Sequence, residues 1–245
     1  MSSAFIKLSF LEQDTIHAAQ VSAYTATTEF IKSNAATLGL DPTTPPESVD
    51  EVSIELLNSL SPDPLTFTKP APLLPSKLTF TLYNDMVPKT VENFLRLCDG
   101  TKGIGKQSKK PLYYKDNKVH RIVEGYIVQW GDIVKGDGSS GDSIYGGKFN
   151  DEPQGLKIPI SRGSLVMANS GKHSNTSQVF VVLSRDSERI KKNMQGKHVV
   201  LGHVVGTREE DDLKSDEAHE GVLVLERLDA IKEDTALVVG DCGVL

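Results

Sequence analysis

Short apolar runs separated by glycine-rich turns recur through the last two thirds of the chain, and this rhythm limits the fold more than any other feature. Strands joined by short turns need no helical crossovers, so the runs predict an antiparallel sheet or barrel. Residue 76 onward is therefore expected to be one mainly β domain. The runs lie at 119–134, 164–168, 179–183 and 199–205, with further strands at 77–82 and 236–239 and helices at 88–100 and 222–230.

Residues 1–75 differ in texture and are expected to form an N-terminal segment beside a barrel domain at 76–245. Two stretches compete to be the first strand of the sheet. Residues 4–11 alternate cleanly between apolar and polar and contain no proline, whereas residues 65–68 lie among prolines. Because proline is poorly tolerated inside a sheet, we favour 4–11 as the first strand. Residues 12–75 are then an insertion between the first and second strands rather than an N-terminal extension.

Two helices are predicted in this N-terminal segment, at 17–38 and 49–60. Gly39 is a plausible stop for the first helix. The second helix has Ser48 and Glu51 at the spacing of a capping box. Its expected apolar stripe consists of Val49, Val52, Leu56, Leu57 and Leu60. The segment offers a possible docking site for a protein partner at residues 12–75.

Composition and charge exclude several classes of function. The 245 residues carry a formal charge of −6, which argues against binding of nucleic acid. No basic stretch followed by a long apolar run opens the sequence, and no run approaches the ~20 apolar residues that cross a bilayer. We therefore expect an intracellular protein, cytoplasmic or nuclear, without membrane contact. Neither Cys98 and Cys242 nor the six histidines have metal-ligand spacing, so no metal and no cofactor is expected.

Two motifs resemble functional sites but have plainer interpretations as surface loops. Residues 136–141 satisfy the glycine pattern of a dinucleotide-binding turn. The following residues, 142–147, cannot open a helix, so a glycine-rich surface loop is the better interpretation. The acidic run at 209–220 is interpreted as a mobile solvated loop rather than as a docking site.

Six blocks in series resemble the cyclophilins, in the order in which that family has them, and the resemblance covers residues 76–245. Taken singly, each block is weak. The blocks are VPKTVENF at 87–94; HRI at 120–122 with GY at 125–126 and QxGD at 129–132; SIYG at 143–146; MANSG at 167–171 with SQVF at 177–180; GKHVVxG at 196–202; and DCG at 241–243.

The resemblance implies a closed eight-stranded antiparallel barrel capped by two helices, with a groove on its outside that binds proline-containing peptides or client proteins and catalyses cis–trans isomerisation of X-Pro bonds. Arg121 would be the catalytic guanidinium, and apolar side chains would grip the proline ring. The residues implied in catalysis are Arg121, Tyr126, Gln129, Phe180 and His198. Those implied in substrate binding are His120, Ile127, Ala168, Asn169, Ser170, Gln178, Asn193 and Met194.

Each residue also has a plainer interpretation, because Arg121 alone could be a surface ion-pair partner and Phe180 alone could be barrel core. The chain departs from the family at several positions. Asn193 stands where tryptophan is common, which weakens the expectation of binding to cyclosporin-like macrocycles. Thr176 and Asp142 alter the expected secondary pocket for residues before the proline. A non-catalytic proline-peptide-binding scaffold module in a larger assembly is therefore the alternative function.

Overall fold

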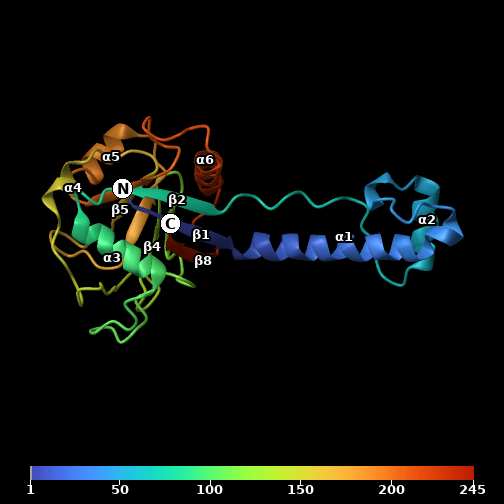
Figure 1. The fold of residues 1–245 in the computed structure, drawn as a ribbon, viewed down its shortest axis with the longest axis horizontal. Helices are drawn as coiled ribbons and strands as arrows, with labels where there is room; N and C mark the ends of the chain where they lie inside the picture. The colour runs from blue at the N-terminus through green and yellow to red at the C-terminus, as the bar shows by residue number, and fades with distance from the viewer. Residues whose placement is uncertain (1) are drawn as a thin grey trace. The chain divides into compact units, whose positions relative to one another are not determined.

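The computed structural model describes residues 2–245 and divides the chain into two units (Figure 1). One unit consists of strand β1 (Ser2–Phe10) together with Pro75–Leu245, and the other of Leu11–Leu74. The chain therefore leaves the sheet after β1 and returns to it at β2 (Lys77–Leu82). Residues 65–68 lie outside any strand.

The sheet has eight strands in the order β3-β4-β6-β5-β7-β2-β1-β8, and every pair of neighbours is antiparallel. Its two edges meet through the residues before β3. The Val119 N–H donates to the Leu237 carbonyl at 3.0 Å, and the Val239 N–H donates to the Asn117 carbonyl at 2.9 Å. The expected eight-stranded antiparallel barrel is thus confirmed. Its other strands are β3 (Arg121–Val123), β4 (Ile127–Trp130), β5 (Ser164–Met167), β6 (Val179–Val182), β7 (Val200–Val204) and β8 (Leu237–Val244).

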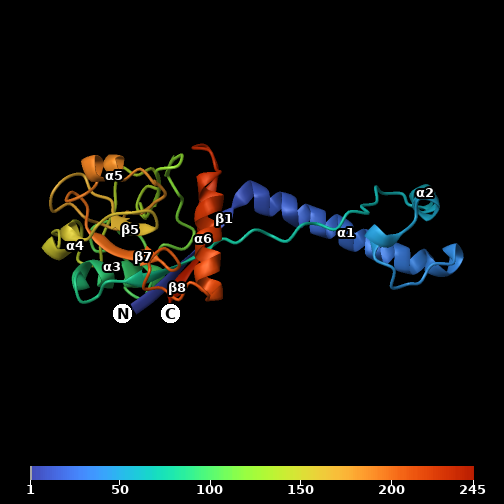
Figure 2. The same ribbon diagram turned by 90° about the horizontal axis from the view of Figure 1, so that it is seen from above.

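Two helices cover the sheet, α3 (Pro88–Asp99) against β1 and β8 and α6 (Asp216–Asp229) against β2 and β7 (Figure 2). Pro88 suits the first turn of α3, and Gly100 ends the helix in the left-handed region at φ 68°. The acidic run was only partly interpreted correctly. Ser215 caps α6 by accepting from the Ala218 N–H, so residues 216–220 are helical rather than a mobile loop.

Side chains that alternate in direction along the strands form two separate apolar clusters, one inside the barrel and one outside it. Val179 and Val181 of β6 belong to the barrel interior, whereas Phe180 and Val182 belong to a second cluster. Neighbouring side chains of a strand point to opposite faces, so the second cluster lies outside the barrel. β6 is buried on both faces, which is why it reads as a continuous apolar run. Two short helices lie between strands. α4 (Pro153–Lys157) lies between β4 and β5, and α5 (Ser187–Asn193) lies between β6 and β7.

The unit formed by Leu11–Leu74 has its own small core. Its elements are α1 (Leu11–Leu38), the 3-10 helix η1 (Pro46–Ser48) and α2 (Glu51–Leu60). Ile31, Val49 and Leu57 are buried together. Helix α1 begins six residues before the predicted start at 17, directly after β1. Within residues 2–245, no helix is both long enough and apolar enough to cross a membrane.

Two expectations for α2 were wrong. Asp50, not Ser48, caps the helix, because the Asp50 carboxylate accepts from the Ser53 N–H at 3.0 Å. Ser48 instead belongs to η1. The predicted apolar stripe is also divided between two faces: Val49 and Leu57 are buried, but three other members are exposed, namely Val52, Leu56 and Leu60.

Candidate functional site

Arg121, Gln129 and Phe180 lie in one row across three neighbouring strands. Arg121 of β3 pairs with Gln129 of β4, and Gln129 pairs with Phe180 of β6. Directly opposed residues of antiparallel strands share one face of the sheet. Because Phe180 belongs to the outer cluster, the whole row lies on the outside of the barrel.

Arg121 begins β3 and its side chain is exposed. Among residues 2–245, no carboxylate lies within 4.0 Å of its guanidinium, since none of the ion pairs includes it. The plainer interpretation, a surface ion-pair partner, is therefore not what the structure shows. Arg121 helps to line a cavity of about 670 Å³.

Phe180 is a buried member of the outer apolar cluster. It is 4% exposed, and Ile127 and Met194 belong to the same cluster. The His198 ring meets Phe180 edge to face, with ring centroids 5.4 Å apart. Burial lowers the pKa of His198 below its ordinary value, against an opposing hydrogen bond between Nδ1 and the Met167 carbonyl at 3.1 Å. Since a carbonyl can only accept, Nδ1 carries a proton and Nε2 of the neutral ring is an acceptor.

Two amide side chains connect this row to the glycine-rich loop at 136–141. Gln129 Nε2 donates to Gln178 Oε1 at 2.8 Å. Gln178 Nε2 in turn donates to the carbonyls of Gly138, at 2.9 Å, and Ser140. The amide orientations are consequently set by backbone carbonyls. The cavity contains six of the expected site residues: Arg121, Gln129, Ala168, Asn169, Ser170 and Gln178.

The cavity wall also includes residues that sequence reasoning did not place in the site. Gln107 and Lys148 both line it, together with Thr176, which was expected in a secondary pocket. Asp142, which was expected to alter the secondary pocket, is not among the residues that line this cavity. Its buried carboxylate accepts from the N–H groups of Gly147 and Ser108 and from the Ser108 hydroxyl, and it holds two loops together.

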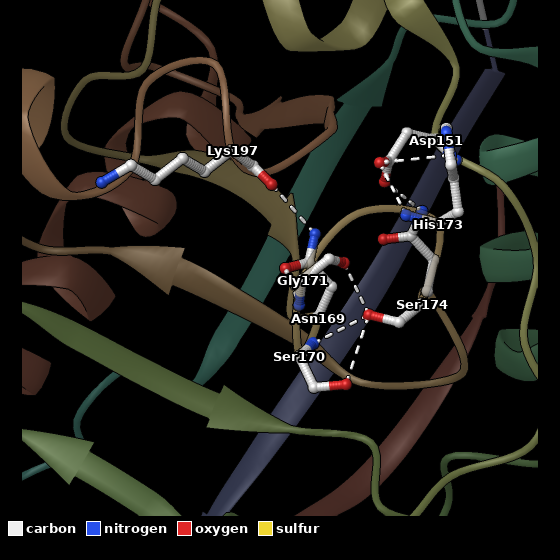
Figure 3. A network of polar contacts seen from close by, with 8 residues as sticks. Asp151, Asn169, Ser170, Gly171, His173, Ser174 and Lys197 are labelled. Carbon is white, nitrogen blue, oxygen red and sulfur yellow. Dashed lines mark hydrogen bonds and ion pairs between the residues drawn. The ribbon is translucent and has the colours of Figure 1, made fainter.

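The loop at 169–175 is held by polar contacts that Figure 3 shows. Asp151 is buried, and its carboxylate accepts from the His173 N–H at 2.9 Å and from Asn175 Nδ2 at 2.8 Å. His173 has φ 59°, a conformation that few residues adopt without such support. Asn169 Nδ2 donates to the Lys197 carbonyl at 3.0 Å, so its amide nitrogen is already engaged within the chain. Its Oδ1 accepts from the Gly171 N–H at 3.4 Å.

Four further site residues lie outside the large cavity. Tyr126 is covered by the Arg189 guanidinium of α5, with Cζ 3.8 Å from the ring centroid, a contact that the sequence did not indicate. Met194 is 4% exposed, whereas Asn193 is exposed at the end of α5. His120 packs near Gly138, where an added Cβ would lie 2.6 Å from the His120 ring.

A second cavity of about 480 Å³ adjoins this region and is lined in part by His198, Asn169 and Lys197. Across residues 2–245, no three His, Cys, Asp or Glu side chains gather in a way that could hold a metal ion. The side chains around the large cavity include the Arg121 guanidinium and the amides of Gln129 and Gln178, and an apolar cluster lies beside them. Such a set can bind a peptide and stabilise a distorted amide.

Comparisons with known proteins agree with this chemistry. The family described as cyclophilin type peptidyl-prolyl cis-trans isomerase/CLD matches residues 73–221. Peptidyl-prolyl cis-trans isomerase CYP21-1 of Arabidopsis thaliana is 48% identical over 130 residues, which cover 53% of this chain and 54% of that protein. The NK-tumor recognition proteins of Mus musculus and Homo sapiens are each 39% identical over 176 residues, covering 69% of this chain and 11% of theirs. The chain thus spans about half the length of the plant relative and a small part of the mammalian ones.

Proposed function

This chain belongs to the cyclophilin-type peptidyl-prolyl cis-trans isomerase family, and we propose that it catalyses cis–trans isomerisation of X-Pro bonds in protein segments, with Arg121 as the catalytic guanidinium. The observation that carries the proposal is the row of Arg121, Gln129 and Phe180 on one outer face of the sheet. A cation, an amide and an aromatic ring thus lie on neighbouring strands of one sheet face.

The reaction needs this combination because no covalent bond is made or broken. Rotation about the imide costs ~18–20 kcal/mol, since amide resonance is lost in the twisted state. The imide nitrogen then regains its lone pair, and a guanidinium that donates to it or to the adjacent carbonyl binds the twisted state more tightly than the planar one. An acceleration of about 10⁵ requires about 7 kcal/mol of such differential binding.

Substrate positions follow from the same geometry. The proline ring is assigned to the apolar surface around Phe180, with Tyr126, Ile127, Met194 and His198 as its neighbours. Gln129, Gln178 and Asn169 would receive the peptide backbone. Residues before the proline would extend into the cavity that Thr176, Gln107 and Lys148 line. His120, Ala168 and Ser170 complete the proposed binding surface.

Replacement of Arg121 tests the catalytic assignment. In Arg121→Ala we expect kcat/KM on a proline tetrapeptide to fall by about a hundredfold or more, because a contact made in the twisted state is lost. Exchange NMR on the peptide measures turnover and binding together. Arg185→Ala is the matched control, since it removes another exposed guanidinium that is paired with Asp229 outside the groove. Equal turnover by wild type and Arg121→Ala would remove the catalytic assignment.

A second candidate function is capture of proline-containing partners without turnover. Two observations favour it: Phe180 and Met194 are each only 4% exposed, and Asn193 stands where the family commonly has tryptophan. A groove with a nearly covered apolar floor could hold a peptide without gripping the ring. Line broadening of the tetrapeptide without cis–trans exchange would favour this module over the isomerase. Asn193 also leads us to propose only weak binding of cyclosporin-like macrocycles.

A further inference from the structure

The negative charge of the protein is concentrated in the unit Leu11–Leu74. These residues include nine Asp or Glu and two Lys, with no Arg, which gives a net charge of −7. The whole chain carries −6, so the remaining residues together carry +1. An isomerase groove does not need this separation of charge, and the excess is available to attract a cationic partner.

Helix α2 of this unit has a buried face and an exposed apolar face. Ser53 and Leu57 are buried and Ile54 packs with the small core. Val52, Leu56 and Leu60 are 69%, 48% and 52% exposed. Their spacing of four residues places them in one row along the helix. Single exposed apolar residues are ordinary, but a row of three on a ten-residue helix is a surface suited to another helix.

Carboxylates accompany this row. Glu51 and Glu55 each precede a member of the row by one position and are exposed. The ten residues of α2 contain no Lys, Arg or His. None of the ion pairs among residues 2–245 includes Glu51 or Glu55. The face therefore combines apolar side chains with unpaired negative charge.

Charge decides between the possible occupants of this face. A second copy of the chain would bring a unit of charge −7 against a unit of charge −7, which opposes association. The remainder of the chain carries only +1 and gives little attraction. A partner segment with apolar residues at helical spacing and Lys or Arg beside them would complement both features. We propose that the exposed face of α2, formed by Val52, Leu56 and Leu60 with Glu51 and Glu55, binds a basic amphipathic helix of a partner protein.

The test uses the full chain and a synthetic probe. The probe is a fluorescent helix of about 18 residues that contains Leu at helical spacing with Lys elsewhere, and its counterpart has Glu in place of Lys. Anisotropy should show binding of the Lys probe, weakened by added salt, and no binding of the Glu probe. The variant Val52→Ser/Leu56→Ser/Leu60→Ser should bind the Lys probe at least about tenfold more weakly. The variant Glu51→Lys/Glu55→Lys should bind the Lys probe at least about tenfold more weakly and lose most of the salt dependence.

A matched control distinguishes this face from general stickiness of the acidic unit. Ile16→Ser/Val21→Ser removes two exposed apolar residues of α1 in the same unit, at unchanged charge, and should bind like wild type. Equal binding of the Lys probe by the triple serine variant, with its helical circular dichroism intact, would overturn the proposal. So would a wild-type dimer that the triple variant abolishes, which would make a second copy the occupant. Absence of binding by wild type would overturn it as well, and isomerase turnover would be unaffected by any of these outcomes.

Discussion

Asp132 shows how a single carboxylate can shape a groove that it does not enter. It is 1% exposed, and it accepts hydrogen bonds from the N–H groups of Val134, Lys135, Gly138 and Ser140 and from the Ser140 hydroxyl. Burial alone would raise the pKa of Asp132, but these bonds outweigh it and hold the pKa well below its ordinary value. The loop that Gln178 contacts is therefore built around one buried negative charge.

We expect Asp132→Asn to lower the free energy of unfolding by about 3 kcal/mol, because an amide presents one acceptor oxygen and a donor where the loop needs two acceptors. The folded-state pKa is lowered, so the ionised group contributes fully above the unfolded-state pKa of about 4 and loses its contribution as pH falls through the folded-state value. The difference between wild type and variant in urea unfolding should therefore narrow below about pH 4.

Asp137→Asn serves as the control for this prediction. Asp137 lies in the same loop but is exposed, and it accepts from the Ser139 N–H at 2.9 Å. We expect little change in stability at any pH. A gap between wild type and Asp132→Asn that stays constant from pH 7 to about pH 3 would contradict the assigned role of the carboxylate.

At the scale of elements, α5 packs beside the expected site residues, with Ile190 in the outer apolar cluster. Asp186 caps it by accepting from the Arg189 N–H at 3.0 Å. Just beyond its end, Gln195 accepts from the Ile160 N–H at 2.9 Å and donates to the Ile158 carbonyl at 3.0 Å. The helix is thus capped at its start and anchored to residues 158–160 just beyond its end, and Arg189 lies over the Tyr126 ring. A seven-residue helix with such anchors can restrict one wall of the proposed proline pocket.

Arg189→Ala should uncover Tyr126 and change substrate binding more than turnover. A cation–π contact at a partly exposed ring is worth ~0.5–1 kcal/mol, so we expect KM on a proline tetrapeptide to change about two- to fivefold with kcat nearly constant. Lys191→Ala, an exposed residue of the same helix, should leave both unchanged. A fall in kcat with constant KM would show instead that Arg189 acts in the twisted state.

At the scale of the whole molecule, the unit Leu11–Leu74 is an insertion between two paired strands. β1 and β2 are antiparallel neighbours, with Lys7 opposite Lys77 and the Leu8 N–H donating to the Ser76 carbonyl at 2.8 Å. The points where the chain leaves and re-enters the sheet are therefore close together, as in a hairpin. An insertion at such a position costs the barrel little beyond the entropy of closing the loop.

We predict that the barrel folds without the insertion. Replacing residues 11–74 by a short turn such as Asn-Gly should give a chain that unfolds cooperatively and turns over a proline tetrapeptide within about twofold of wild type. Urea unfolding and exchange NMR measure the two properties. Loss of cooperative unfolding would show that the insertion supports the barrel and would contradict the proposed division of the chain.

Strands and helices could be predicted from local patterns of apolar residues. A period of two or 3.6 residues shows which face of a segment is buried, wherever only one face is buried. Most strands, and α3 with its stop at Gly100, could be identified in the sequence, although the single run at 119–134 divides into β3 and β4. Arg121, Gln129 and Phe180 were identified through the family resemblance. The pattern did not show which apolar residues of α2 are buried, because this helix has residues of the same types on its buried face and on its exposed face.

Tertiary structure decided what each polar side chain does. Asp142 and Asp151 hold loops 34 and 22 residues away, and Arg189 lies over Tyr126, 63 positions earlier in the chain. Nothing in a local period encodes these partners, because they depend on which loops the barrel brings together. Amino-acid type and spacing thus predicted a mainly β domain, and the family resemblance predicted the residues on its outer face, whereas the walls of the groove were determined by contacts between segments that are distant in sequence.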